Sequence, residues 1–257
     1  MSKRLIKHAQ INRYFIAQMF LTRLPTPVAV QWSKHELAAS AGYFPVVGLP
    51  VGIISSIAWT IGYYGWSSAM AALFAVVAAI LVTGAFHEDG LADSADGLGG
   101  AFEVDKKLAI MRDSRIGTYG SVALLLAIST KIAAISLLTP DTAITTLIGA
   151  HVVARWTSLP LIYNNHYVRE QGTGKPFAAE ITKNQVIASS IFSVLIAALC
   201  FGFLLPVVAV AVLAGLLFAQ WYSRLKLGGI TGDILGAINS LTEVLVYLVI
   251  AANWTTL

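Results

Sequence analysis

The sequence predicts an all-α membrane protein, a polytopic transmembrane helical bundle of about seven spans with an N-terminal helix in the membrane interface. The first observation is composition: 57% of the 257 residues are hydrophobic and 12% are charged, about half the charged fraction of a soluble domain. The second is the recurrence of apolar stretches of about 20 residues, the length of a membrane-spanning helix. The third is an uneven distribution of lysine and arginine. We expect residues 1–257 to form a single integral membrane domain.

The chain opens with residues 1–34, a segment that we place in the cytoplasm and the membrane interface. Residues 8–24 mix aromatic and basic side chains in the manner of an interfacial helix, and Pro25 and Pro27 stop that helix. No cleavable signal peptide is recognised. The first span carries Pro45 and Pro50, which favour a kink. The expected spans are residues 38–62, 67–86, 118–138, 143–163, 186–205, 207–223 and 234–252.

Positive charge orients these spans. With a cytoplasmic N-terminus, every lysine and arginine outside the spans falls on the cytoplasmic side, and only Lys131 and Arg155 lie within spans. This pattern is the positive-inside rule, and it places the C-terminus outside. The net charge of +4 is explained by the basic residues that orient the protein in the membrane, so we expect no nucleic-acid partner. The longer polar loops then share the cytoplasmic side, which becomes the expected active face: residues 87–117, 164–185 and 224–233.

The segment Phe86–Gly100 concentrates acidic residues in an otherwise apolar chain. If it is helical, Asp89, Asp93 and Asp96 fall at positions i, i+4 and i+7 and share one face. Like charges so placed repel, and a cluster of hard oxygen ligands suits Mg²⁺ or Mn²⁺, most naturally shared with a phosphate. The lone Cys200 excludes a multi-cysteine metal site. We therefore predict a metal site here; the alternative is a solvated acidic loop.

A basic motif precedes the third span. Arg112, Ser114 and Arg115 are followed by glycines at a helix start, a pattern typical of a phosphate site because arginine binds two oxygens at once. Both arginines serve equally well as positive-inside anchors, and this alternative stays open.

A glycine-rich motif, residues 228–237, leads into the last span. It offers exposed backbone N–H groups together with Thr231 and Asp233, which we expect to be the helix N-cap. These groups could bind phosphate or metal, or could simply cap the helix. The loop 163–177 is rich in hydrogen-bond donors and could cover a bulky polar substrate or act as an ordinary connector.

Four ionisable residues stand inside the predicted spans. Burial of charge at membrane depth is costly, so a functional site or an ion pair is the default expectation. Arg155 and Glu243 lie at similar depth from the cytoplasmic ends, and we expect them to pair; His151 and Lys131 complete the set, and the sequence names no partner for Lys131. A structural salt bridge is an equally good explanation.

Three runs of residues occur in this order along the chain: His87-x-Asp89-Gly90-Leu91-Ala92-Asp93-x-Ala95-Asp96-Gly97, Met111-Arg112-Asp113-Ser114-Arg115-Ile116-Gly117 and Gly228-Gly229-x-Thr231-Gly232-Asp233. With the length and hydropathy of the chain, they resemble the cobalamin synthase family, the adenosylcobinamide-GDP ribazoletransferases. The resemblance covers essentially the whole chain. It implies a bacterial inner-membrane enzyme that joins α-ribazole, or its 5′-phosphate, to adenosylcobinamide-GDP with release of GMP and dependence on Mg²⁺.

The resemblance lets us assign roles as hypotheses. Asp89, Asp93 and Asp96 would hold Mg²⁺ on the diphosphate. The large corrin substrate implies a wide cleft or a groove between spans, and a late pathway step in the membrane suggests a homo-oligomer or a complex with other late cobalamin enzymes. The substrate-binding candidates are Arg112, Ser114, Arg115, Thr231, Asp233 and Arg155, and the candidate proton acceptors are His87, Glu88 and Asp113.

Three other functions compete with this one. A CDP-alcohol phosphotransferase also uses an aspartate cluster in a membrane helix, but its signature needs an arginine where this chain has Asp93. A divalent-cation transporter predicts carboxylates at bilayer depth in several spans, whereas Glu243 alone qualifies here. A purely structural subunit does not explain the acidic residues and arginines on one face.

Overall fold

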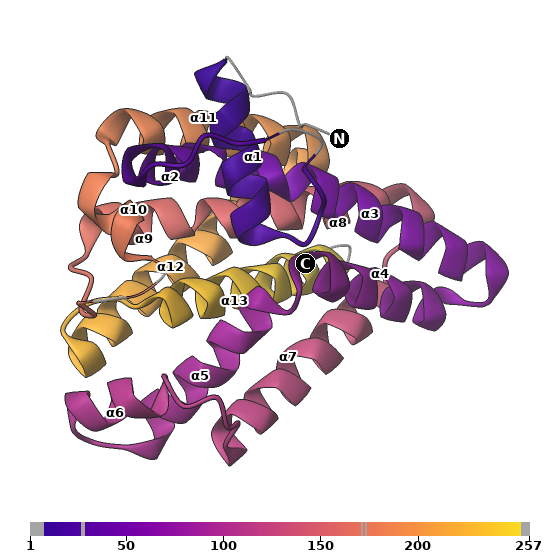
Figure 1. Ribbon diagram of the computed structural model, residues 1–257. Coiled ribbons are helices and arrows are strands. Elements are labelled where there is room, and N and C mark those ends of the chain that lie inside the picture. Colours follow the sequence, from indigo (N-terminus) through magenta and orange to yellow (C-terminus); the bar gives the residue numbers. More distant parts are fainter. Residues whose placement is uncertain (1–7, 27–28, 171, 173, 253–257) are drawn as a thin grey trace.

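The computed structural model describes residues 8–26, 29–170, 172 and 174–252, and these residues are almost entirely helical (Figure 1). An isolated β-bridge between Tyr167 and Ile230 joins two loops. The helices are α1 (Ala9–Leu21), α2 (Lys34–Ser40), η1 (Ala41–Tyr43), α3 (Phe44–Gly65), α4 (Ser68–Thr83), α5 (Phe86–Gly100), α6 (Val104–Ile110), α7 (Thr118–Ser136), α8 (Pro140–Trp156), α9 (Ser158–Asn164), α10 (Lys175–Glu180), α11 (Lys183–Phe201), η2 (Gly202–Leu204), α12 (Leu205–Leu227) and α13 (Gly232–Ala251). The all-α membrane bundle is confirmed.

Each predicted span overlaps a helix, but the number seven is not confirmed. By length and apolar composition, four helical stretches of the described chain could cross a membrane: Lys34–Gly65, Thr118–Ser136, Lys183–Leu227 and Gly232–Ala251. The bent pair α4 and α5 would make a fifth. Helix α8, counted as a span from the sequence, has only 17 residues and packs most of them inside the protein. Apolar residues in α8 therefore build the core, which hydropathy alone does not distinguish from a lipid-facing surface.

The helix at the N-terminus ends near the predicted residue. Helix α1 stops at Leu21, with Thr22 as its C-cap, before Pro25; Pro27 lies outside the described residues. Helix α3 continues through Pro50, and the irregular backbone lies earlier, at η1.

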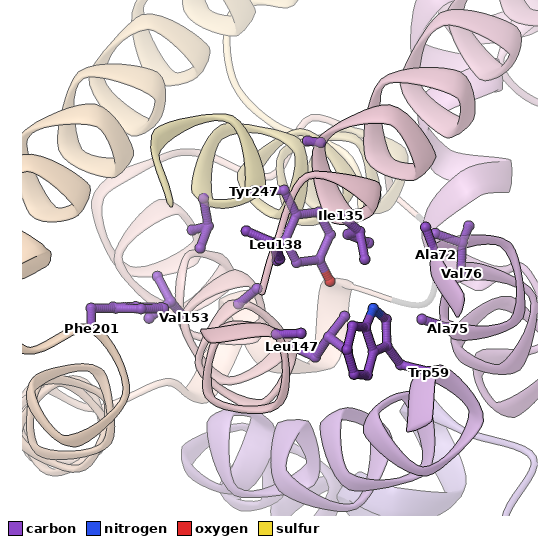
Figure 2. Close-up of a cluster of buried hydrophobic side chains, with 14 of the residues drawn as sticks. Trp59, Ala72, Ala75, Val76, Ile135, Leu138, Leu147, Val153, Phe201 and Tyr247 are labelled. Carbon is purple, nitrogen blue, oxygen red and sulfur yellow. The ribbon is translucent and has the colours of Figure 1, made fainter. Parts of the chain in front are cut away.

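The main hydrophobic core lies between α3, α4, α7, α8 and α13. Figure 2 shows Trp59 of α3, Ala75 of α4 and Tyr247 of α13 meeting in this cluster. Burying large side chains of this kind contributes about 1.5–3 kcal/mol each in water. In a membrane, close packing replaces part of that driving force. This core supports the helices that carry the polar motifs.

The chain bends by 88° between α4 and α5. Two successive residues, Gly84 with φ of 65° and Ala85 with φ of 57°, adopt the left-handed conformation. Glycine takes it freely, whereas alanine pays a steric cost and is held there by its surroundings. The segment 87–117, expected as a polar loop, contains most of α5 and all of α6. After the bend, α5 packs against α7 and α13.

The other two polar segments meet each other on the left of Figure 1, where the connection from α9 to α10 reaches the α12–α13 turn. Val168 N–H donates to the carbonyl of Ile230 (3.0 Å), and Ile230 N–H donates to the carbonyl of His166 (2.9 Å). Arg224 adds a hydrogen bond from Nε to Asn165 Oδ1 at 2.6 Å. The predicted proximity of these two segments is therefore real, and backbone pairing sustains it.

Candidate functional site

Helix α5 carries its three aspartates in different environments. The predicted helix is present over Phe86–Gly100. Asp89 is exposed, Asp93 is half-buried and Asp96 is buried. The i, i+4 pair Asp89 and Asp93 thus forms the open part of the acidic face.

The Asp96 carboxylate accepts hydrogen bonds from backbone N–H groups. Its Oδ2 accepts from Gly117 N–H at 2.7 Å, and its Oδ1 accepts from Gly120 N–H at 2.8 Å. The two glycines are required here, because a Cβ on Gly117 would approach Asp96 Oδ1 to 2.5 Å and one on Gly120 would collide with Asp96 Oδ2. The negative charge of this carboxylate also lies at the N-terminus of α7, where the positive end of the helix dipole stabilises it. Because each of its oxygens accepts a backbone N–H, Asp96 caps the start of α7; its assignment as a metal ligand stays a prediction.

Helices α5 and α13 cross at two glycines. A Cβ on Gly90 would come within 2.8 Å of the carbonyl oxygen of Asp233 and 3.0 Å of Gly236 Cα. This close approach brings the start of α13 against the acidic face of α5. Asp233 therefore joins Asp89 and Asp93, although it is distant in sequence.

Thr231, not Asp233, is the N-cap of α13. The Thr231 hydroxyl accepts from Ile234 N–H at 3.3 Å, and the residue is fully buried. Our expectation that Asp233 caps the helix was wrong. Thr231 also donates to Asp233 Oδ2 at 3.3 Å and so helps to hold that carboxylate in place; its burial counts against direct contact with a substrate.

Three carboxylates and one guanidinium form the charged group of this face. The charge of Asp93 interacts with those of Asp89, Asp233 and Arg169. Arg169 Nη2 lies 2.6 Å from Asp233 Oδ2. No three His, Cys, Asp or Glu side chains converge closely enough to hold a metal ion by themselves within the described residues. A cation here would need further oxygens from a bound ligand.

Sequence reasoning missed Arg169. It belongs to the donor-rich loop that we expected to cover a substrate, but nothing in the local pattern separated it from the neighbouring polar residues. An arginine in a loop on the predicted active face was the available signal. Its partner Asp233 lies on another element, and only the paired loops bring the two together.

The basic motif forms an exposed turn between α6 and α7. Arg112, Ser114 and Arg115 are all exposed, and no ion pair of the described chain involves Arg112. Arg115 instead pairs with Asp113, with Nη2 at 2.6 Å from Oδ2. This hydrogen-bonded guanidinium lowers the pKa of Asp113 from 3.8 to about 2. A carboxylate so acidic is a poor proton acceptor near neutral pH, which counts against the role predicted for Asp113.

The predicted buried pair is part of a larger ionic cluster. Lys131 Nζ lies 2.7 Å from Glu243 Oε2 and 3.2 Å from Glu88 Oε1. His151 Nδ1 lies 2.8 Å from Glu243 Oε1, and Arg155 Nη1 is 3.8 Å from the same oxygen. The Arg155 and Glu243 pairing is therefore present but long, and Lys131 has two partners.

This cluster counts against two predicted assignments. Glu88 was a candidate proton acceptor, yet it is buried and held by Lys131. Arg155 was a candidate for substrate binding, yet it is 1% exposed and donates to the His151 carbonyl at 2.9 Å. Both residues instead tie α5, α7, α8 and α13 together inside the bundle.

His87 is buried inside the bundle. It is 5% exposed and lines a small cavity of about 30 Å³ with Phe20, Phe177 and Gly236. No ion pair within the described residues involves it. A substrate would reach His87 only if α10 or the neighbouring loop moved.

A second, larger hollow lies on another side of α5. It measures about 810 Å³, and apolar side chains of α5, α12 and α13 line it, among them Leu91, Leu98, Phe218, Tyr222 and Leu245. A groove between helices was expected for a large substrate, and that this hollow takes the corrin stays a prediction. Its lining is suited to an apolar group rather than to the diphosphate.

The comparisons with known proteins agree with the motifs. Residues 13–251 match the family described as Cobalamin-5-phosphate synthase. Adenosylcobinamide-GDP ribazoletransferases of Shewanella frigidimarina and Shewanella amazonensis are 39% and 36% identical, over 95% and 96% of this chain and 95% and 97% of their own lengths. The Vibrio cholerae protein of that name is 36% identical over 95% of this chain and 94% of its own. No solved structure matches. The chain belongs to the cobalamin-5-phosphate synthase family, a family of transferases.

Proposed function

We propose that this protein completes the nucleotide loop of cobalamin. It transfers adenosylcobinamide phosphate from adenosylcobinamide-GDP to α-ribazole, or to α-ribazole 5′-phosphate, and releases GMP. The observation that carries the proposal is the open acidic face of Asp89, Asp93 and Asp233, with Arg169 beside it and the arginine turn at residues 112–115 on the neighbouring element. The names of the relatives support it.

The transfer breaks one phosphoanhydride bond and forms one phosphate ester bond. A ribose hydroxyl oxygen of the acceptor attacks the phosphorus attached to adenosylcobinamide, and the bond from that phosphorus to the bridging oxygen breaks. GMP leaves with the bridging oxygen, and the hydroxyl proton passes to a protein base and then to solvent. Positioning and charge neutralisation supply most of the catalysis in such transfers.

The donor set fits Mg²⁺. The possible ligands are the hard carboxylate oxygens of Asp89, Asp93 and Asp233. These three carboxylates outnumber the one arginine beside them, so the face has room for a cation. Mg²⁺ prefers one or two carboxylates together with substrate phosphates over an all-protein cage, which agrees with the lack of a convergent three-ligand group in the described residues. When bound, the ion would neutralise the diphosphate oxygens.

The exposed arginine turn is suited to the leaving phosphate. Arg112 has its guanidinium free of ion pairs in the described chain, and Ser114 and Arg115 lie beside it at the surface. Arginine binds phosphate oxygens in pairs, which orients the leaving group as well as attracting it.

For the proton acceptor we keep His87. Glu88 and Asp113 are each paired with a basic side chain: Glu88 with Lys131 at 3.2 Å and Asp113 with Arg115 at 2.6 Å. His87 pairs with neither basic side chain and stands two residues before Asp89 on α5. Access to it requires the neighbouring loop to move, which binding of a large substrate would bring about.

We place the protein in the bacterial inner membrane, with the active face and the N-terminus in the cytoplasm and the C-terminus outside. The lysine and arginine distribution supports this orientation. The apolar groove of about 810 Å³ would take part of the corrin ring at the level of the lipid. A homo-oligomer or a complex with other late cobalamin enzymes stays part of the proposal.

The test is GMP release by the purified protein in detergent, given adenosylcobinamide-GDP and α-ribazole, with and without Mg²⁺. We expect release only when both substrates and the metal are present. Asp89→Asn should abolish release while the thermal unfolding profile stays that of the wild type. Release without Mg²⁺, or from the Asp89→Asn variant at the wild-type rate, would overturn the metal assignment. The cation-transporter alternative is weakened because both core carboxylates, Glu88 and Glu243, are paired with Lys131.

A further inference from the structure

Arg169 is a nearly buried arginine whose binding capacity is only partly used. It is 9% exposed. Its Nη2 lies 2.6 Å from Asp233 Oδ2 in an ion pair without hydrogen-bond geometry, and both its Nε and its Nη2 are buried with no hydrogen-bond partner in the described chain. A guanidinium has five N–H donors, and leaving a buried donor unpaired is costly. A donor left in this way beside an acidic cluster points to a missing ligand.

The backbone, rather than the ion pair alone, holds Arg169 in place. The two hydrogen bonds between Val168, Ile230 and His166 fasten its loop to the turn before α13. Gly229 packs so tightly on this loop that a Cβ there would collide with the His166 carbonyl oxygen. The Arg169 backbone would therefore stay at the acidic face if the pairing with Asp233 were released.

Asp233, the partner of Arg169, is also a potential ligand for a cation. Asp233 lies against α5 because Gly90 admits it there, and its charge interacts with that of Asp89. An incoming Mg²⁺ bound to a diphosphate brings both charges at once. The cation competes with Arg169 for Asp233, and the phosphate oxygens compete with Asp233 for Arg169, since guanidinium matches phosphate and carboxylate equally well in geometry.

We propose that Arg169 is a substrate-binding residue that exchanges Asp233 for a diphosphate oxygen when adenosylcobinamide-GDP binds, and so frees Asp233 for the metal. The exchange rests on the proposed function, because it takes the diphosphate as its ligand. Arg169 keeps an anionic partner before and after binding. In the resting state the pair also keeps an arginine from attracting other anions.

The test measures GDP binding to the purified, full-length protein in detergent with EDTA, so that no metal contributes. Arg169→Met and Arg169→Lys should weaken binding by about 10-fold or more, the usual effect of losing a hydrogen bond between charged groups. Asp233→Asn should instead tighten binding, because Arg169 no longer has to leave a carboxylate. A pair with a merely structural role predicts the same direction for both residues.

The double variant separates exchange from simple charge removal. Asp233→Asn also removes a negative charge, which alone would favour GDP. If Arg169 is the binding group, most of the tightening disappears when Asp233→Asn is made in the Arg169→Met background. Tightening of the same size in both backgrounds would overturn the proposal, and so would equal GDP affinity of wild type and Arg169→Met.

Arg13→Met is the matched control. Arg13 and Glu36 form a similar arginine–carboxylate pair at 2.8 Å between α1 and α2, and its loss should leave GDP affinity unchanged. Thermal unfolding of each variant identifies those that do not fold, and Arg169→Lys retains the positive charge if Arg169→Met fails. GMP release by the wild type tests the proposed function separately. Wild type that releases GMP while Arg169→Met binds GDP normally would defeat the exchange and leave the function standing.

Discussion

Gly90 of α5 and Gly236 of α13 lie face to face, so close that a Cβ added to Gly236 would stand 3.2 Å from Gly90 Cα. Each glycine belongs to one of the polar motifs seen in the sequence. Their contact sets the distance between the two helices, and through it the position of Asp233 relative to Asp89 and Asp93. The motif glycines thus have a packing role that positions the acidic face.

Gly90→Val should therefore separate the two helices. Its side chain would meet the Asp233 carbonyl, and overpacking of this kind costs about 1–3 kcal/mol. We expect a lower unfolding temperature and a large loss of GMP release. Gly65→Ala is the control, because nothing lies within 4 Å of that position. Wild-type activity in Gly90→Val would show that the crossing does not position the site.

Asp96→Asn should behave as the loss of a helix cap. Asparagine replaces one of the two carboxylate oxygens with an NH₂ group, a donor that would face the backbone N–H of Gly117 or Gly120, and lost caps cost about 0.5–2 kcal/mol. The variant should unfold at a lower temperature but keep the wild-type Mg²⁺ concentration for half-maximal GMP release. A raised Mg²⁺ requirement with unchanged stability would support Asp96 as a metal ligand.

Lys131→Met should be strongly destabilising. It leaves Glu88 and Glu243 buried beside each other without the shared ammonium group, and breaking a buried ion pair costs about 3–5 kcal/mol. Lys106→Met is the matched control, since Lys106 and Glu103 form an exposed pair of the kind worth about 0–1 kcal/mol. Thermal unfolding in detergent measures both. Equal small effects would mean that the buried cluster contributes no more than a surface pair.

Asp113→Asn should leave the pH dependence of GMP release unchanged near neutrality. The pKa of Asp113 is lowered below 3.8 to about 2 by Arg115, so the stabilisation from its ionised form is present above pH 3.8 and is lost only as the pH falls towards about 2. The carboxylate does not change protonation in the working range. If the acid limb of the pH profile shifts in Asp113→Asn, Asp113 is the proton acceptor after all.

The local features of this fold were predictable from the sequence. Apolar stretches identified the long helices because helix formation and burial depend on neighbouring residues. The spacing of Asp89 and Asp93 placed them on one face of α5 for the same reason. The motif order also indicated the family. Span number was less predictable, because α8 owes its apolar residues to the protein core and not to the membrane.

Pairings between distant elements were decided by the tertiary structure. The sequence alone determined which side chains are acidic, basic or small, and along which helices they lie. It could not assign Asp96 to the amides of α7, Lys131 to two glutamates, or Arg169 to Asp233, because each partner arrives from another helix or loop. Such contacts depend on how helices cross and loops pair, and these are set by packing over the whole chain. The helix of the acidic motif was therefore predictable from residue spacing, whereas the set of residues around it was determined only by the tertiary structure.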